Sequence, residues 1–294
     1  MSFVSFCSLS RISHISRFAW RSLTAHNRFS IVSKRMNYSA DELAEHVAGS
    51  VEKSRSVEKP FYHLEFDRVF PEDLYARMLQ LMPGSDDYRA LPGRHGVNLK
   101  ADGKSTRIKL DLFPEFTCHL ADEKRSIWSL VGRALCSAKV KESFVHRLAP
   151  GLEKRFGSRF QDVGMYPIPI LTRDFGGYNI TPHTDTHWKG ITVQFYLPPD
   201  DSTLDIGTVF HDHLPDGSLP KATRMKFAPN SGYAFAVHND TWHSADKVRA
   251  DVKSRDSILL TYFVDSGPLL FLRNRSRRVG NCLLNEFKYR FQSH

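Results

Sequence analysis

The sequence lacks the features that mark several classes of protein. No stretch approaches the run of about 18 apolar residues that a membrane-spanning helix needs, so we expect no membrane span. No segment recurs at the spacing of a solenoid or a propeller. A C-x-x-C pair is also missing, which argues against a zinc ribbon or a dithiol redox centre and fits free thiols in a reducing compartment. The cysteines are scattered over the chain as Cys7, Cys118, Cys136 and Cys282.

Acidic residues are absent from the first 35 positions, which separates the start of the chain from the rest. Six basic residues lie there, so the formal net charge of +9 leaves +3 for the remainder. A Ser- and Arg-rich start without acid resembles a mitochondrial transit peptide. Two alternatives are a disordered tail and translation from Met36, where the composition changes. We therefore expect a cytoplasmic protein, or a mitochondrial one if residues 1–35 are a transit peptide.

The remaining length is enough for one substantial core. We divide it into a helical support region at 36–161 and a catalytic core with a C-terminal extension at 162–294. Ser39 can cap a first helix, and Pro71 is a favourable first residue for a second one. Between them, the segment PFYHLEFDRVF at 60–70 alternates like a strand, with Tyr62, Leu64 and Phe66 on one face. We expect this strand and the second helix to pack outside a central sheet.

The second half of the support region contains a long loop and a helical stretch. Residues 86–106 are polar and rich in glycine, which indicates either a lid or binding loop or a disordered surface segment. Residues 121–157 carry apolar stripes at helical spacing, and Pro150 interrupts the run. We expect these helices to back the sheet.

From about Asp162 the sequence changes to short β-rich segments separated by turn residues, which is typical of an all-β sandwich or barrel. The segments are VGMYPIPILTR, YNITPHTD, GITVQFYLP, IGTVFH, ATRMKFAP, GYAFAVH and SILLTYFVD. The double-stranded β-helix, or jelly roll, is favoured because it gathers strand ends around one metal pocket. The predicted fold is therefore mainly β with flanking helices, α+β overall.

The stretch GGYNITPHTD contains the strongest candidate for a metal site. His183 and Asp185 are separated by one residue, so on an extended strand their side chains leave the same face and can meet one ion. A third imidazole from a distant strand would complete two histidines and one carboxylate on one side of the metal. That arrangement leaves positions open for oxygen and a co-substrate, as in non-haem Fe(II) oxygenases.

His243 is the favoured third ligand, because it follows an aromatic residue just after a tight turn. His238 ends an apolar strand and is the alternative. His211 and His213 flank an acidic loop, so we expect them to face water. His187, two residues after Asp185, lies too far along the same strand to converge with His183 and Asp185 on one ion. We expect it on the rim of the pocket, where it can contact substrate.

Two residues that open the last β-rich segment form a candidate anion anchor. Arg255 and Ser257 are two apart and share a face of that strand. A guanidinium binds a carboxylate through two parallel hydrogen bonds, and the serine hydroxyl can donate a third. The alternative is an ordinary surface salt bridge, for which Arg249 or Lys253 would serve equally well.

The segment ITVQFYLP offers polar groups to the same pocket. One parity directs Thr192, Gln194 and Tyr196 inward, where buried polar groups need a bonding partner such as a bound co-substrate. The opposite parity would turn the apolar set toward the core and the polar set to solvent. Arg173 and Tyr178 lie on the approach to the H-x-D pair and are candidates for the pocket mouth.

Taken together, the motifs G-Y-x-x-x-P-H-T-D, F-Y-L-P, W-H-S and R-D-S resemble the Fe(II)/2-oxoglutarate-dependent oxygenase superfamily, on its prolyl-hydroxylase-like side, over roughly residues 162–265. The resemblance implies that Fe(II) is held by His183, Asp185 and His243. It implies that the distal carboxylate of 2-oxoglutarate is bound by Arg255, Ser257 and Tyr196. The implied reaction uses O2 and 2-oxoglutarate as co-substrates, releases succinate and CO2, and by default hydroxylates a substrate that the sequence does not identify.

Two other readings stay open at this stage. One is a metal-binding jelly roll that no longer catalyses and serves as a sensor or interaction domain. The other is a zinc hydrolase that uses the same three ligands. Binding to nucleic acid is not expected, because the basic segment RNRSRR near Arg273 has no interleaved aromatic residues and favours a solvated turn.

Overall fold

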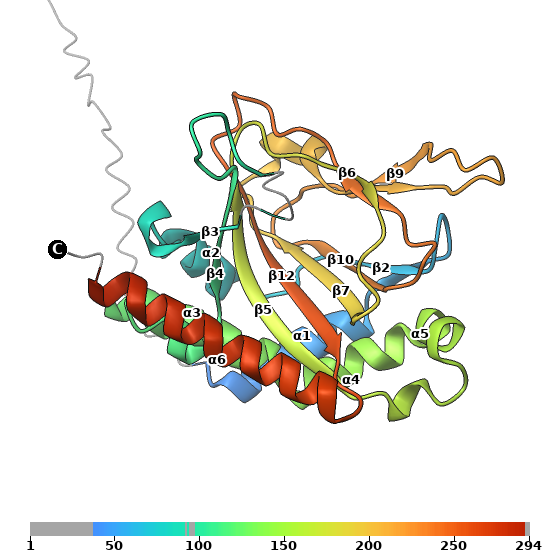
Figure 1. The fold of residues 1–294 in the computed structure, drawn as a ribbon, viewed down its shortest axis with the longest axis horizontal. Coiled ribbons are helices and arrows are strands. Elements are labelled where there is room, and N and C mark those ends of the chain that lie inside the picture. Colours follow the sequence, from blue (N-terminus) through green and yellow to red (C-terminus); the bar gives the residue numbers. More distant parts are fainter. Residues whose placement is uncertain (1–37, 92, 94–97, 292–294) are drawn as a thin grey trace, which may run out of the picture. The chain divides into compact units, whose positions relative to one another are not determined.

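Two antiparallel sheets form the centre of the fold (Figure 1), which a computed structural model describes for residues 38–91, 93 and 98–291. The predicted leader at 1–35 lies outside the described residues. In spatial order, the large sheet consists of β1 (Arg55–Val57), β2 (His63–Phe66), β10 (Gly232–Ala236), β7 (Lys189–Tyr196), β12 (Arg255–Val264), β5 (Met165–Asp174), β4 (Arg107–Asp111) and β3 (Arg89–Ala90). The small sheet consists of β6 (Ile180–His183), β11 (His243–Ala245), β8 (Val209–His211) and β9 (Lys221–Arg224).

The eight strands from β5 to β12 are distributed over the two sheets as in a jelly roll. β5, β7, β10 and β12 lie side by side in the large sheet, whereas β6, β8, β9 and β11 make up the small one. Each sheet therefore takes strands from both halves of the segment, which is the pattern of an eight-stranded double-stranded β-helix. This confirms the predicted fold class.

The support region extends both edges of the large sheet. On one side, β2 pairs with β10 with Leu64 opposite Ala234, so the prediction that residues 61–66 pack outside the sheet was wrong. Three of the four β2 residues are buried, and pairing with β10 satisfies their backbone groups. On the other side, β4 pairs with β5, with Arg107 opposite Asp174. The sequence analysis assigned no strand to 107–111.

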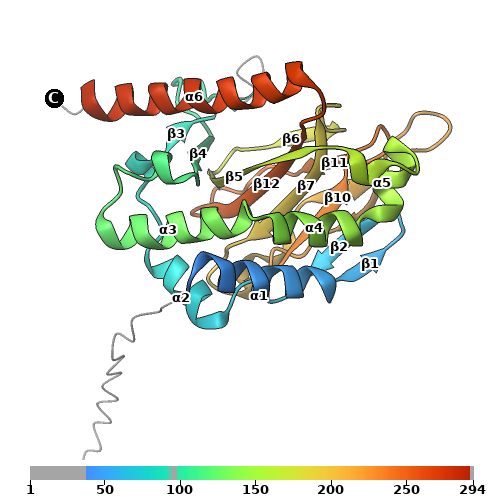
Figure 2. The same cartoon turned by 90° about the horizontal axis from the view of Figure 1, so that it is seen from below.

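Helices cover the outer face of the large sheet, as expected, and Figure 2 shows α1, α3 and α4 beneath it. The first helix begins after Ser39, whose hydroxyl accepts the Glu42 amide in a capping box. The ring of Phe144 in α4 lies 6.5 Å from that of Phe195 in β7, centroid to centroid. The helices are α1 (Ala40–Glu52), α2 (Glu72–Gln80), α3 (Asp122–Leu135), α4 (Ala138–Arg147), α5 (Ala149–Phe156) and α6 (Pro268–Phe291).

One helical prediction agrees with the structure and one does not. The run is interrupted near Pro150, as predicted, because α4 ends at Arg147 and Pro150 lies in the first turn of α5, where its missing N–H costs nothing. The basic segment around Arg273 lies within the long helix α6, so the predicted solvated turn was wrong. None of the helices among the described residues is long and apolar enough to cross a membrane.

Candidate metal centre

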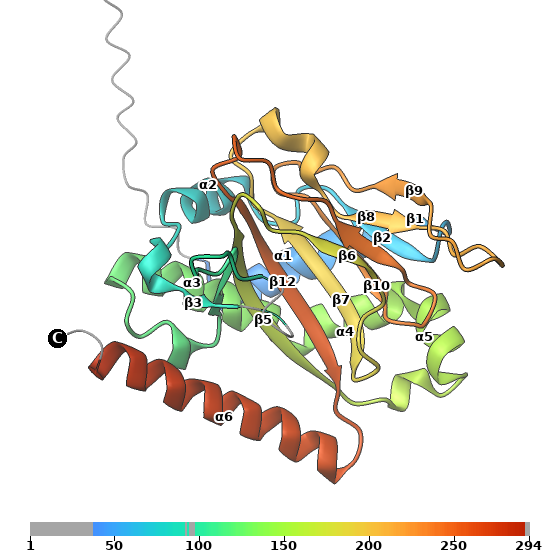
Figure 3. The same cartoon turned by 45° about the horizontal axis from the view of Figure 1, so that its top comes forward.

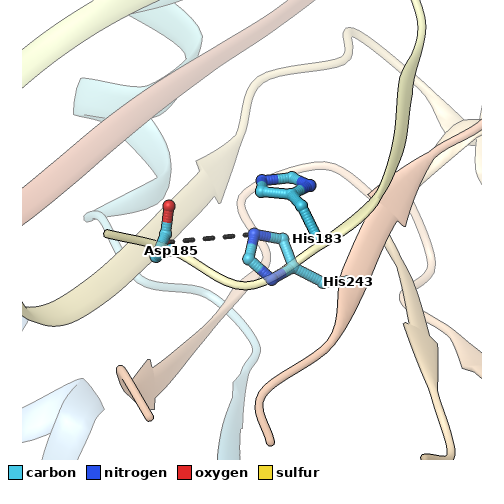
Figure 4. A group of neighbouring side chains, drawn as sticks. All are labelled: His183, Asp185 and His243. Carbon is cyan, nitrogen blue, oxygen red and sulfur yellow. Dashed lines mark ion pairs between the residues drawn. The ribbon is translucent and has the colours of Figure 1, made fainter. Parts of the chain in front are cut away.

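Two cross-strand histidines and one carboxylate from a loop converge at the edge of the small sheet (Figure 4). His183 and His243 are direct partners in the β6–β11 ladder, and their ring centroids lie 4.4 Å apart. Asp185 follows β6 by two residues and turns its carboxylate to the pair, with Oδ2 4.0 Å from Nε2 of His243. One donor atom from each residue lies within 4.8 Å of the other two. The structure thus brings together the three predicted ligands.

Both imidazoles are held in the tautomer that a metal requires. Nδ1 of His183 lies 2.9 Å from the carbonyl oxygen of Thr181, and Nδ1 of His243 lies 3.0 Å from that of Thr241. A carbonyl oxygen only accepts, so each Nδ1 carries the proton and donates it. Each Nε2 is then left with its lone pair, which is the form that coordinates a metal ion.

The charges of the group also suit a divalent cation. Burial lowers the pKa of His243 to about 4, despite the opposing effect of Asp185, so the imidazole is neutral near pH 7. Burial alone would raise the pKa of the Asp185 carboxyl, but Lys189 and His243 hold it well below its usual range. Lys189 Nζ lies 2.5 Å from Asp185 Oδ1, and the Thr192 hydroxyl donates to Oδ2 at 2.6 Å. Two neutral imidazoles and one carboxylate form the facial donor set of Fe(II) oxygenases.

A pocket of about 130 Å³ opens from this group into the space between the sheets. Most of its lining residues are polar or charged, and it is small compared with the roughly 300–1,000 Å³ of sites for drug-sized ligands. The lining residues are Arg107, Thr172, Tyr178, Ile180, His183, Asp185, Lys189, Thr192, Gln194, Thr208, Tyr233, His243, Ser244, Ala245, Arg255 and Leu259. The pocket therefore fits a small polar molecule.

Two arginines share one carboxylate beside the pocket. Asp174 is fully buried and accepts from Nε of Arg107 at 2.5 Å and from Nη2 at 2.8 Å. Arg255 donates to the same carboxylate from Nε at 3.0 Å and from Nη2 at 2.8 Å. Burial alone would raise the pKa of Asp174, but the two guanidinium groups lower it. The Tyr178 ring lies under both, 4.0 Å from Cζ of Arg107 and 5.2 Å from Cζ of Arg255.

Several lining residues were not predicted from the sequence, and Arg107 is the one that carries charge next to Arg255. It belongs to β4, in the support region, and the β4–β5 register places it opposite Asp174. The alternation of charged and apolar residues in RIKLD could have predicted this strand. It was not used, because charged residues occupy the positions that would have to be buried.

The inward parity predicted for β7 agrees with the structure. Thr192 and Gln194 line the pocket. Tyr196 is also buried between the sheets, but its hydroxyl accepts the Thr208 amide and it is not among the lining residues. Ser257 likewise lies behind the wall, where its hydroxyl accepts from Nε2 of Gln194 at 2.9 Å. The structure therefore places Tyr196 and Ser257 next to the lining residues rather than in contact with the pocket.

Arg173, predicted at the pocket mouth, and His187, predicted on the rim, are not among the lining residues. Arg173 has the opposite parity to Thr172 on β5, and its Nε lies 2.7 Å from the Asp256 carboxylate. His187 is exposed, with its ring centroid 4.2 Å from that of Trp188. The structure brings neither of them to the pocket.

The other histidines lie apart from the three donors. His211 is 3% exposed, and its Nε2 lies 2.8 Å from the Ser244 hydroxyl, so the expectation that it faces water was wrong. His238 pairs through Nδ1 with the Asp240 carboxylate at 2.6 Å. His213 is exposed, as expected, and lies near Trp242 with ring centroids 5.6 Å apart.

Comparisons with known proteins give distant structural matches. No family model matches the chain, and a search of curated proteins finds no relative. A prolyl-4-hydroxylase from Pseudomonas putida is 12% identical over 74% of this chain and 98% of its own, with a TM-score of 0.44. A prolyl hydroxylase from Trichoplax adhaerens, in complex with a peptide fragment of hypoxia inducible factor, is 13% identical over 77% and 91%, with a TM-score of 0.44. A member of the 2OG-Fe(II) oxygenase family from Burkholderia pseudomallei is 15% identical over 75% and 89%, with a TM-score of 0.41.

Proposed function

We propose that this chain is a non-haem Fe(II)- and 2-oxoglutarate-dependent dioxygenase that hydroxylates a substrate still to be identified and releases succinate and CO2. The observation that carries the proposal is the geometry of His183, Asp185 and His243. Their donor atoms lie within 4.8 Å of one another at one end of a polar pocket. The Arg107 and Arg255 side chains line the same pocket.

The three donors fit a ferrous ion and leave part of its coordination shell to other ligands. The chain supplies two imidazole nitrogens and one carboxylate, and the backbone carbonyls of Thr181 and Thr241 orient the two rings. When bound there, Fe(II) would supply the activation of O2 that couples decarboxylation of 2-oxoglutarate to oxidation of a C–H bond. Lys189 and Thr192 hold the carboxylate of Asp185 in position.

The charges around the pocket favour a small dianion as co-substrate. Arg107, Arg255 and Lys189 carry three positive charges, whereas Asp174 and Asp185 carry two negative ones, so one positive charge is left before any metal binds. Guanidinium groups bind carboxylates with good geometry. We infer that Arg255, with Arg107 beside it, binds the distal carboxylate of 2-oxoglutarate, while Thr192 and Gln194 contact its other polar atoms.

The proposal is tested by measuring succinate and O2 consumption in purified protein loaded with Fe(II) and given 2-oxoglutarate. We expect succinate formation that needs both iron and oxygen, that rises with the correct substrate and that is lost in Asp185→Ala. Asp256→Ala is a matched control, since that carboxylate pairs with Arg173 away from the pocket. Metal binding without any turnover across a substrate panel would favour a silent sensor domain. Activity that persists without oxygen would favour a zinc hydrolase.

A further inference from the structure

The long helix α6 turns an apolar face to solvent. Among the described residues, seven of the ten exposed large apolar side chains belong to this helix, with exposed fractions from 48% to 82%. They are Leu269, Phe271, Leu272, Val279, Leu283, Leu284 and Phe287. An apolar patch of this size on one element marks an interaction site, because folded proteins rarely leave one in contact with water.

Three arginines of α6 contact the body of the protein. Arg275 forms an ion pair with Asp265 at 2.6 Å, and Arg278 forms one with Glu115. Arg273 lies over the Trp188 ring, 4.3 Å from its centroid. The helix is thus attached by its polar side, which reverses the usual orientation of a surface helix.

The attachment leaves space beneath the helix. A groove of about 380 Å³ runs between α6 and the body, and its lining residues include Tyr166, Val279 and Leu283. Val279 and Leu283 are nevertheless 59% and 66% exposed, so they border the groove and also face solvent. Figure 3 shows α6 with the rest of the described fold along one side of it only. Hydrophobic burial against the body therefore accounts for little of the docking of α6, and its apolar residues remain available for another surface.

We propose that the apolar face of α6 binds the same face of a second copy of this chain, so that the protein is a homodimer. Two-fold dimers use one self-complementary patch on both subunits, and this patch has the required pattern. Leu269, Leu272, Ser276, Val279 and Leu283 recur at intervals of three and four residues, the a and d spacing of helices that pair side by side. Ser276 is small and Gly280 has no side chain, so two helix backbones can approach closely at these positions.

Area and charge both favour this occupant. Phe271 lies beside Arg275 on another side of the helix, and the other six residues present on the order of 700 Å² of surface, close to what each partner buries in a standard interface. None of the exposed α6 residues whose side chains the structure describes carries a charge. The described part of this face therefore brings no like charges together when it meets the same face of a second copy.

The experiment is to measure the mass of the full chain in solution by light scattering and sedimentation over a concentration series. We expect a dimer for the wild-type protein, and a loss of dimer affinity of roughly 100-fold or more for Leu283→Glu, because the new charge would be buried twice in a two-fold interface. Leu214→Glu is the matched control, since this leucine is 43% exposed on the loop between β8 and β9 and lies outside α6. That control should remain dimeric.

A second measurement does not depend on the stability of the charged variant. Val279→Cys should form a disulfide-linked dimer under mild oxidation, beyond any background from the native cysteines seen in the wild-type protein, and Leu214→Cys should not. A wild-type protein that stays monomeric overturns the proposal. So does a dimer that Leu283→Glu leaves intact, because its interface lies elsewhere. Flotation of a monomer with phosphatidylcholine–phosphatidylglycerol vesicles would overturn it in favour of a lipid surface.

Discussion

Replacing the shared carboxylate, Asp174→Asn, should destabilise the fold and at the same time strengthen the response to the co-substrate. In the wild-type protein this fully buried group accepts hydrogen bonds from Nε and Nη2 of both Arg107 and Arg255. An amide has no charge, and its NH2 group faces a guanidinium that can only donate. Two buried cations are then left without a counter-ion.

The size of the effect follows from the cost of an unpaired buried charge. Removing one partner of a buried ion pair costs about 3–5 kcal/mol, which corresponds to a fall in Tm of roughly 10 °C for a chain of this size. Urea denaturation and thermal unfolding of the metal-free protein measure it. Asp256→Asn is the control. Burial raises the pKa of Asp256, and this carboxyl pairs only with Arg173 among the described arginines. Asp256→Asn should therefore lower the free energy of unfolding less than Asp174→Asn does.

The same variant tests whether Arg107 and Arg255 bind the co-substrate. Asp174→Asn raises the net charge beside the pocket by one, so 2-oxoglutarate should stabilise the variant more than it stabilises the wild-type protein. The reasoning is refuted if the variant loses less than about 1 kcal/mol, because water or ions would then satisfy both guanidiniums. A co-substrate that raises the two Tm values equally would show that these arginines do not bind it.

The remaining predictions concern single residues. His183→Ala should abolish Fe(II) binding, measured by calorimetry, and unchanged affinity would remove it from the metal centre. Arg255→Ala should raise the 2-oxoglutarate concentration needed for half-maximal succinate formation with iron still bound, whereas Arg173→Ala should not. In protein freed of metal by a chelator, the pKa of His243 is about 4 in the folded state and about 6.5 in the unfolded state. Between these two pH values the unfolded state therefore binds more protons than the folded state. Stability should therefore fall by about 3 kcal/mol as pH drops from 6.5 to 4, and His243→Asn should flatten this dependence, followed by urea midpoints.

Local patterns in the sequence were sufficient to predict the jelly roll, but they did not predict the sheet edges. Strand β4 was missed because its charged residues are buried by ion pairs. Arg107 meets Asp174, and Lys109 meets Asp111 at 3.1 Å. A hydrophobicity pattern counts such residues as exposed, whereas pairing across strands decides their position. Strand β2 was predicted, but its pairing with β10 was not, because that pairing depends on the topology of the whole chain.

In the candidate site, too, the spacing of residues in the sequence predicted some members, whereas others depend on contacts that only the folded structure shows. The H-x-D spacing already pointed to His183 and Asp185, and the structure adds that His243 is the ladder partner of His183. His211 was expected in solvent, because the sequence could not show that the Ser244 hydroxyl and the Leu219 carbonyl would satisfy its ring in the interior. In α6, the basic segment suggested a solvated turn, but Arg273, Arg275 and Arg278 lie in a helix and contact the body of the protein. The roles of Arg255, Ser257 and Tyr196 in binding the co-substrate stay predictions.

The ladder pairing of His183 with His243 makes the proposed metal centre depend on complete folding. The two rings come from strands β6 and β11, near opposite ends of the jelly-roll segment, and they meet only when the intervening strands have taken their places in both sheets. Contacts so distant in sequence form late in folding. Newly made chains would therefore acquire tight affinity for iron only at the end of maturation, and a misfolded chain with intact secondary structure would remain unable to retain the ion.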